Sequence, residues 1–200
     1  MPQFDLRGIR IGEYINTSDV ITYDTTKTIG EAMNVNLELR FAEGRLYAES
    51  TLAEYIRKAT GGTISIGVKY IPDDAAQLMY GATAKTRTIS TGSTSKTING
   101  TVYSSRDVAK YVGVAFYAPD MVDGVEKYTC IFAKKALFGP PSYTLQTMGE
   151  NITFATPTTS GEFLAANKAD KELLEVAVCD SEADAIAWTY SVMGDTAPTV

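Results

Sequence analysis

Alternation of apolar and polar side chains is the feature that most constrains the fold of this chain. At residues 35–41 the odd positions are apolar and the even positions polar, and residues 61–71 repeat the pattern. Side chains of a strand point alternately to opposite faces, so this period predicts strands with one face on a core and one polar face. The 25 threonines and 12 tyrosines agree, because both residue types suit a pleated, half-buried surface. We therefore expect a mainly β protein.

Shorter patterns predict the remaining strands. They cover residues 6–15, 111–118, 127–134, 151–156, 161–165 and 173–179. Glu43-Gly44 predicts a turn, with residues 45–48 as the return strand of a hairpin. Residues 119–124 are rich in turn formers and are expected to join two strands as a loop.

Two helices stand out against the strands. Pro72 and two acidic residues suit the first turn of a helix that ends at Gly81. A second helix is expected to begin near Ser181, which forms a capping-box pattern with Asp184, and to end at Gly194. Its expected buried face comprises Ala183, Ile186, Ala187, Tyr190 and Met193, and Trp188 is also expected in the core. Residues 194–200 are expected to be a short flexible tail.

Composition excludes several kinds of chemistry. The chain has no histidine, which removes histidine-based catalysis and histidine metal ligands. Its two cysteines, Cys130 and Cys179, are too few for a disulfide scaffold or a cysteine zinc cluster, and each is expected to act as a small apolar residue. No phosphate-binding glycine motif is present. We therefore expect no cofactor, no metal and no enzymatic activity.

The charge balance is acidic and uneven. The chain has 18 basic and 24 acidic residues, a net charge of −6. Residues 1–100 hold 11 of each sign, whereas residues 101–200 hold 7 basic and 13 acidic residues. A cluster of acids at residues 170–184 is either a solvated rim with a charged helix start or a surface that repels a polyanion. Neither version favours binding to duplex DNA, which requires positive charge.

One segment has an unusual composition. Nine of the fifteen residues at 83–97 are serine or threonine, with Lys85, Arg87 and Lys96 among them and no acid. The segment is either an exposed loop or floppy hairpin, or an arm at residues 82–100 that orders against another subunit. The three basic residues are the candidate contacts of such an arm.

The second half of the chain contains an ordered series of motifs: YVGVAF at 111–116, KYTCIF at 127–132, FGPPS at 138–142, GENITFATPT at 149–158 and ADAIAW at 183–188. In this series the chain resembles the major tail tube proteins of long-tailed bacteriophages, notably the type common in phages of Gram-positive bacteria. The resemblance covers most of residues 30–193. The segment at 83–97 looks longer than the corresponding link of that family.

The resemblance implies one tail tube domain over residues 1–200, a β-rich α+β fold with an antiparallel β-sandwich or half-barrel flanked by one or two helices. It implies six copies per ring, with strands of adjacent subunits joined into a continuous barrel and rings stacked into a hollow tube. The implied function is structural: the tube conducts genome DNA from capsid to host, with tape measure, tail terminator and baseplate or distal tail proteins as partners. The implied location is the virion tail, assembled in the host bacterial cytoplasm without membrane contact.

Alternatives to this interpretation remain open. A β-sandwich module of a virion that binds carbohydrate or a receptor is one, and a hydrolase built on carboxylates is another. The inner tube of a contractile tail or of a phage-tail-like particle shares the expected fold. Within the tube hypothesis, Glu38 is the candidate lumen-facing residue, because it lies on the polar side of residues 35–41.

Overall fold

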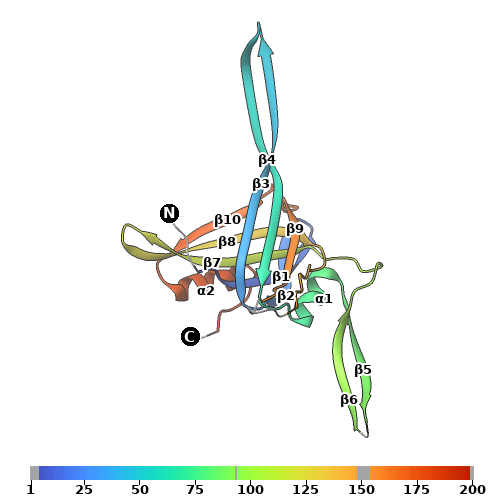
Figure 1. Ribbon diagram of the computed structural model, residues 1–200. Helices are drawn as coiled ribbons and strands as arrows, with labels where there is room; N and C mark the ends of the chain where they lie inside the picture. Colours follow the sequence, from blue (N-terminus) through green and yellow to red (C-terminus); the bar gives the residue numbers. More distant parts are fainter. Residues whose placement is uncertain (1–4, 93, 148–153, 199–200) are drawn as a thin grey trace.

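The computed structural model describes residues 5–92, 94–147 and 154–198, and its described part is mainly β (Figure 1). One open antiparallel sheet of eight strands is accompanied by a two-stranded sheet and two helices. The elements are β1 Arg7–Thr17, β2 Val20–Thr28, β3 Ala32–Ala48, β4 Thr51–Val68, α1 Asp73–Tyr80, β5 Thr83–Thr91, β6 Thr94–Val102, β7 Val112–Val122, β8 Val125–Phe138, β9 Thr158–Leu164, β10 Leu174–Cys179 and α2 Glu182–Ser191. The expected mainly β class is confirmed.

The large sheet has two open ends. Its strand order is β2-β1-β7-β8-β9-β4-β3, and β10 pairs with β8 beside this path. Strands β3 and β4 run steeply across β7, β8 and β10 in Figure 1, so the sheet turns a corner where β8 meets β9. Strands β2 and β3 lie at the two ends of this path, and β10 is a third strand with one side unpaired among the described residues.

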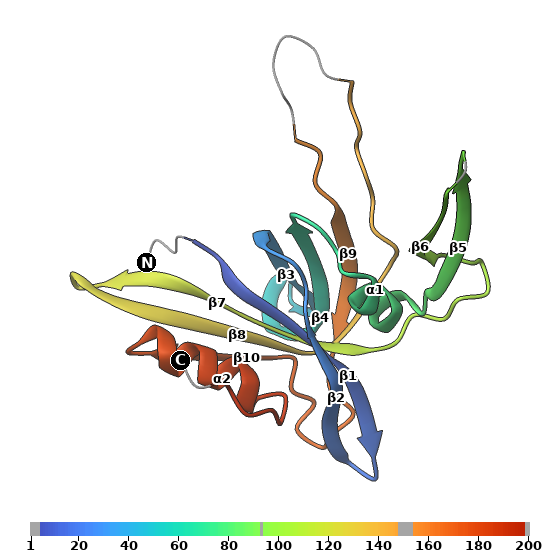
Figure 2. The same ribbon diagram turned by 90° about the horizontal axis from the view of Figure 1, so that it is seen from below.

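The helices cover opposite faces of the β7–β8 pair. Val114 and Phe116 of β7 belong to the main core, together with Met79 of α1. The neighbouring positions Ala115 and Tyr117 pack instead in smaller clusters that include residues of α2. Figure 2 shows α2 lying along β10 and β8, away from α1. Alternation along β7 thus serves two cores, one under each helix.

Both predicted helices are present, but α2 ends at Ser191 and not at Gly194 as predicted. Helix α1 ends at Gly81, whose φ of 69° is the left-handed conformation that glycine adopts most easily. Ser181 caps α2, because its hydroxyl accepts a hydrogen bond from the Asp184 amide at 3.1 Å. The expected face of α2 is partly wrong, since Ala183 and Ala187 are exposed and the buried positions are Ala185, Thr189 and Met193. Trp188 is half-buried between the two smaller clusters.

The predicted hairpin turn at Glu43-Gly44 is wrong. Strand β3 continues to Ala48, with Gly44 paired to Ile56 of β4, and the turn lies at Glu49-Ser50. Both turn residues have positive φ, 50° and 65°, in a pair of non-glycine residues that gives little sequence signal. Residues 45–48 therefore extend the first strand and are not a return strand.

The expected loop at residues 119–124 is also shorter than predicted. Strand β7 runs through Pro119 to Val122, and Asp123-Gly124 forms a two-residue turn with φ of 51° and 81°. Proline is tolerated because, among the described residues, β7 has no partner on its β1 side beyond Tyr117. Of the strand predicted at residues 151–156, the first three residues lie outside the described residues, and 154–156 are not in a strand.

Candidate functional site

Residues 83–102 form an isolated hairpin, named here the basic arm. In the part of the chain that the structure describes, strands β5 and β6 pair only with each other, and they project from the body beside α1 (Figures 1 and 2). The Thr101 hydroxyl donates to Asp73 of α1 at 2.7 Å, which anchors the base of the arm. The segment is thus an exposed two-stranded hairpin, and its contact with another subunit stays a prediction.

The basic arm has two chemically different faces. In the β5–β6 register, Arg87 lies opposite Ile98 and Ile89 lies opposite Lys96. Directly opposite residues share a face, so Lys85, Arg87 and Lys96 lie together with the two isoleucines on one face. The other face carries alanine, threonine, serine and asparagine only: Ala84, Thr86, Thr88, Ser90, Ser95, Thr97, Asn99 and Thr101. All three candidate contact residues are therefore presented in one direction.

A second candidate surface is the outward face of β3, β4 and β9, named here the polar face. It comprises Asn36, Glu38, Arg40, Thr63, Ser65, Ser160 and Glu162. None of these residues is buried, whereas Leu37, Ile64 and Phe163 on the opposite face pack into or against the main core. Glu38 thus lies on the polar side of its strand, as predicted.

Within the polar face the charge of Glu162 is neutralised by an ion pair, whereas the charge of Glu38 is not. Arg40 donates to Glu162 at 2.7 Å across the sheet. The Glu38 carboxylate accepts a hydrogen bond from the Asn36 side-chain amide at 3.1 Å. A neutral donor does not cancel its charge, so Glu38 contributes a negative charge to this face.

The far half of the β3–β4 hairpin is a second projecting element, the β3–β4 arm at residues 41–59. Strand β9 pairs with β4 only from Gly61 onwards, so the arm is a bare two-stranded ribbon. Leu46, Tyr47, Leu52 and Ile56 are each more than half exposed. Leu46 and Ile56 lie on one face of the ribbon, and Tyr47 and Leu52 lie on the other. Exposed apolar side chains on both faces of a bare ribbon are typical of an element that another protein covers.

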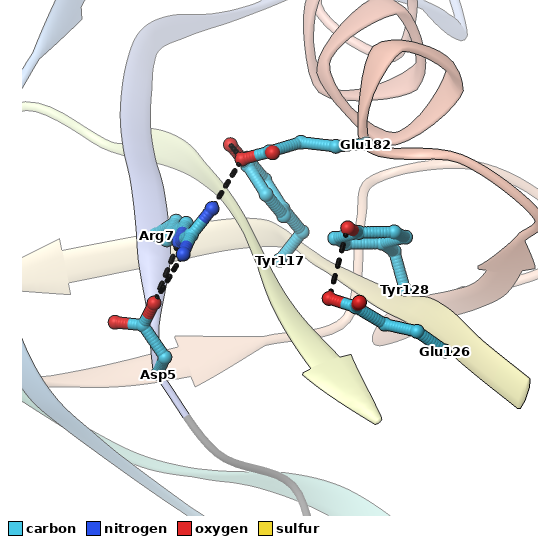
Figure 3. A network of polar contacts seen from close by, with 6 residues as sticks. All are labelled: Asp5, Arg7, Tyr117, Glu126, Tyr128 and Glu182. Carbon is cyan, nitrogen blue, oxygen red and sulfur yellow. Dashed lines mark hydrogen bonds and ion pairs between the residues drawn. The ribbon is translucent and has the colours of Figure 1, made fainter. Parts of the chain in front are cut away.

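A third surface is acidic and comprises the start of β1, the start of α2 and the end of the β7–β8 hairpin, which extends past both. Figure 3 shows its centre, in which Arg7 donates to Asp5 and to Glu182, each at 2.7 Å. The Tyr117 hydroxyl donates to Glu182 at 3.1 Å. Burial, and then the bond to Glu182, raise the pKa of Tyr117 to about 12, so it stays a donor at neutral pH.

This third surface, named here the acidic end, has more acids than bases. Its acidic members are Asp5, Asp120, Asp123, Glu126, Asp180, Glu182 and Asp184. Two cations lie among them, Arg7 and Lys127, and the second is bound to Asp180 at 2.8 Å. The acidic end therefore holds most of the net negative charge of the chain.

A pocket of about 620 Å³ separates β2 from α2. Tyr23, Phe132 and Trp188 form aromatic walls. The Lys134 ammonium in the pocket is bound by Glu172 and by Glu175, the latter at 3.1 Å. Lys134 is therefore ion-paired within the chain, on the wall of the pocket.

No local pattern in the sequence predicts that the two cysteines meet. Cys130 on β8 and Cys179 at the end of β10 have sulfur atoms 3.7 Å apart. Burial, and next the neighbouring thiol, raise the pKa of Cys130 to about 12. Only the pairing of β8 with β10, which no local pattern encodes, brings them together.

No group of three or more acidic or cysteine side chains within the described ranges is arranged to hold a metal ion. In the same residues, neither helix has the length and apolar character needed to cross a membrane. No protein-family model matches this chain, and no curated protein matches it either.

Proposed function

We propose that this chain is a structural virion protein whose six-copy rings stack into the hollow tail tube of a long-tailed bacteriophage. The observation that carries the proposal is an open sheet whose edge strand β3 borders an exposed polar face. An unpaired edge of this length invites another strand. Together with the resemblance of residues 30–193 to tail tube proteins, this favours closure by copies of the same chain.

In the proposed ring, strands of neighbouring subunits continue the sheet around a barrel. Closure removes the open edges at β2 and β3, which a lone subunit exposes. The polar face then lines the lumen, and the main core and α1 lie outside it. In this arrangement each subunit contributes the half-barrel of the tail tube fold.

The polar face suits a channel for DNA. A tube that conducts a polyanion must not retain it, and duplex DNA carries one charge per about 1.7 Å of axis. Glu38 and Glu162 outnumber Arg40 among the charged members of the face. A lumen lined in this way repels phosphate weakly and binds no base specifically.

The proposal includes partners and place. The lumen holds the tape measure protein before ejection and genome DNA during it, and the tube ends contact the tail terminator and the distal tail or baseplate proteins. The subunits assemble in the host cytoplasm and reside in the virion tail. No enzymatic step, cofactor, metal or membrane takes part.

Electron microscopy of the purified protein tests this proposal. We expect rings with sixfold symmetry and stacked tubes at high protein concentration or with the tail initiator complex. Substituting apolar residues of the β3–β4 arm, as in Leu46→Ser/Ile56→Ser, is expected to shorten the tubes while the subunit stays folded. A monomer that never polymerises, even with the initiator, would contradict the proposal.

A virion binding module is the second candidate, because one feature of the β3–β4 arm favours it. Phe41, Tyr55 and Tyr47 follow one another along one face, which is how a carbohydrate platform is built. Arg57 lies over Phe41, at 3.8 Å from the ring centroid, and Arg45 lies over Tyr55 at 5.5 Å. A monomer or trimer that binds glycans through Tyr47 and Tyr55 would favour this candidate over the tube.

Tubes surrounded by a sheath would instead identify the inner tube of a contractile tail or of a phage-tail-like particle.

A further inference from the structure

We infer that the basic face of the arm binds the acidic end of a second copy of this chain in a head-to-tail contact. The inference rests on the proposed function, since it names the surfaces that join copies within the tube. It concerns a segment in which the chain departs from the family it resembles.

The three cations of the basic face are unpaired within the described chain. Among the described residues, Lys85, Arg87 and Lys96 make no ion pair, and all three are exposed. The register places them on one face, which concentrates three positive charges on a narrow ribbon. A surface of this charge suits an acidic partner.

The acidic end carries the charge that would complement the basic face of another copy. The acidic end holds seven carboxylates and two cations, which leaves five negative charges. Asp120 contributes although it is only 4% exposed, and its Oδ1 has no hydrogen-bond partner among the described residues. Its ladder neighbour Lys127 binds Asp180 instead.

The basic arm and the acidic end lie on opposite sides of the subunit. In Figures 1 and 2 the basic arm and the tip of the β7–β8 hairpin project from opposite sides of the body. The two surfaces of one copy therefore cannot meet each other. Complementary surfaces on opposite sides of a subunit form heterologous contacts, which close into rings or continue as filaments.

Both the basic face and the acidic end also expose apolar side chains. Ile89 and Ile98 lie on the basic face and are 38% and 45% exposed. Met121 and Val125 at the β7–β8 tip are 45% and 58% exposed. An isolated two-stranded hairpin is marginal in water, so burial of these side chains in a contact would stabilise the arm.

The test compares two variants of the full-length chain. Lys85→Thr/Arg87→Thr/Lys96→Thr removes three positive charges from the basic face and keeps residues with high β propensity. In sedimentation velocity experiments we expect this variant to self-associate at least about tenfold more weakly than the wild type. Raising the salt concentration should weaken the wild type and have little effect on the variant.

The matched control is Thr86→Glu/Thr88→Glu/Thr97→Glu. It changes the net charge by the same three units but on the opposite face of the same hairpin. We expect its self-association to stay within about twofold of the wild type in the same measurement. Equal weakening by both variants would overturn the inference, because net charge and not the basic face would then govern assembly.

A charge exchange identifies the docking surface. Lys85→Glu/Arg87→Glu is expected to abolish association, and mixing it with Asp123→Asn/Glu126→Lys is expected to restore it in part. No restoration would overturn the choice of the acidic end. Loss of binding to duplex DNA by the basic-face variant, with normal self-association, would assign the arm to nucleic acid instead. If the wild type forms rings and the two variants that remove positive charge from the basic face form them equally well, only this inference fails. A wild type that forms no rings contradicts the proposed function.

Discussion

The guanidinium of Arg10 lies over the ring of Tyr190, with its central carbon 3.5 Å from the ring centroid. The same guanidinium donates to Asp195 at 2.8 Å. Arg10 belongs to β1, whereas the other two residues lie at the end of α2 and just beyond it, so this contact joins the two ends of the described chain. The tail expected to be flexible is therefore bound at Asp195.

Replacing Arg10 with alanine is expected to lower the free energy of unfolding by about 2–3 kcal/mol, because the buried guanidinium provides both a cation–π contact and an ion pair. Urea denaturation measures this loss. Arg40→Ala is the control: both side chains of the Arg40–Glu162 pair are 57% exposed, and such pairs contribute about 0–1 kcal/mol. Equal losses in both variants would contradict the structural role of Arg10.

Glu38→Lys is expected to leave tube assembly intact and to slow genome ejection by about twofold or more at low salt, because six new cations per ring contact phosphate. The delay should shrink as salt rises, since the Debye length is about 8 Å at physiological salt. Ejection kinetics from phage carrying the variant measure it. Asp19→Lys, in the β1–β2 turn, makes the same charge change away from the polar face and should eject normally. Unchanged ejection with Glu38→Lys in the lumen would remove electrostatic repulsion as the explanation.

Replacing Thr83–Val102 with an Asn-Gly turn is expected to leave the subunit folded and to weaken tube formation. Thr83 and Val102 are paired, so a two-residue turn can bridge their neighbours, and the hairpin shares no ladder with the main sheet. We expect a melting temperature within about 3 °C of the wild type, because little buried area is lost. Tubes of normal length and stability would mean that the arm is only a surface loop.

Oxidised glutathione is expected to convert Cys130 and Cys179 into an internal disulfide, with their sulfur atoms already 3.7 Å apart. The half-buried Cys179 attacks first as thiolate and releases one glutathione thiolate; Cys130 then displaces the second. This step should be slow at neutral pH, since the pKa of Cys130 is raised to about 12. Mass spectrometry should show the loss of two hydrogens. Cys130→Ser should instead retain one glutathione, and a wild type that also retains it would contradict the expected pairing.

Glu172 is expected to contribute to acid sensitivity. The hydrogen bond from Lys134, and next its charge, lower the pKa of Glu172. As the pH falls, Glu172 therefore takes up its proton in the unfolded state before it does so in the folded state. The contribution of the Glu172–Lys134 contact to stability is complete above about pH 4.3 and is lost as the pH falls through the lowered pKa of Glu172. Glu172→Gln should flatten this acid-side loss in denaturation curves measured from pH 6 downwards. Glu49→Gln, in the exposed β3–β4 turn, should keep the wild-type slope.

Local sequence determined both helices and seven strands of the main sheet, whereas strand β2 at Val20–Thr28 was not predicted and residues 83–102 were left open. A period of two needs only neighbouring residues, which is why Glu38 could be placed on the polar side of its strand. Helix ends are equally local, so Ser181 and Gly81 were readable as caps.

Tertiary pairing decided what the sequence could not. Gly44 resembles a turn residue, but sixteen pairs between β3 and β4 carry the strand past it and place the turn at Glu49-Ser50. Lys96 joins Lys85 and Arg87 on one face only through the β5–β6 register, and Cys130 meets Cys179 only because β10 pairs with β8. Register depends on the summed contacts of whole strands, and a shift of one residue moves every side chain to the other face. For that reason the faces within each strand followed from the sequence, whereas the surfaces shared between strands followed only from the fold.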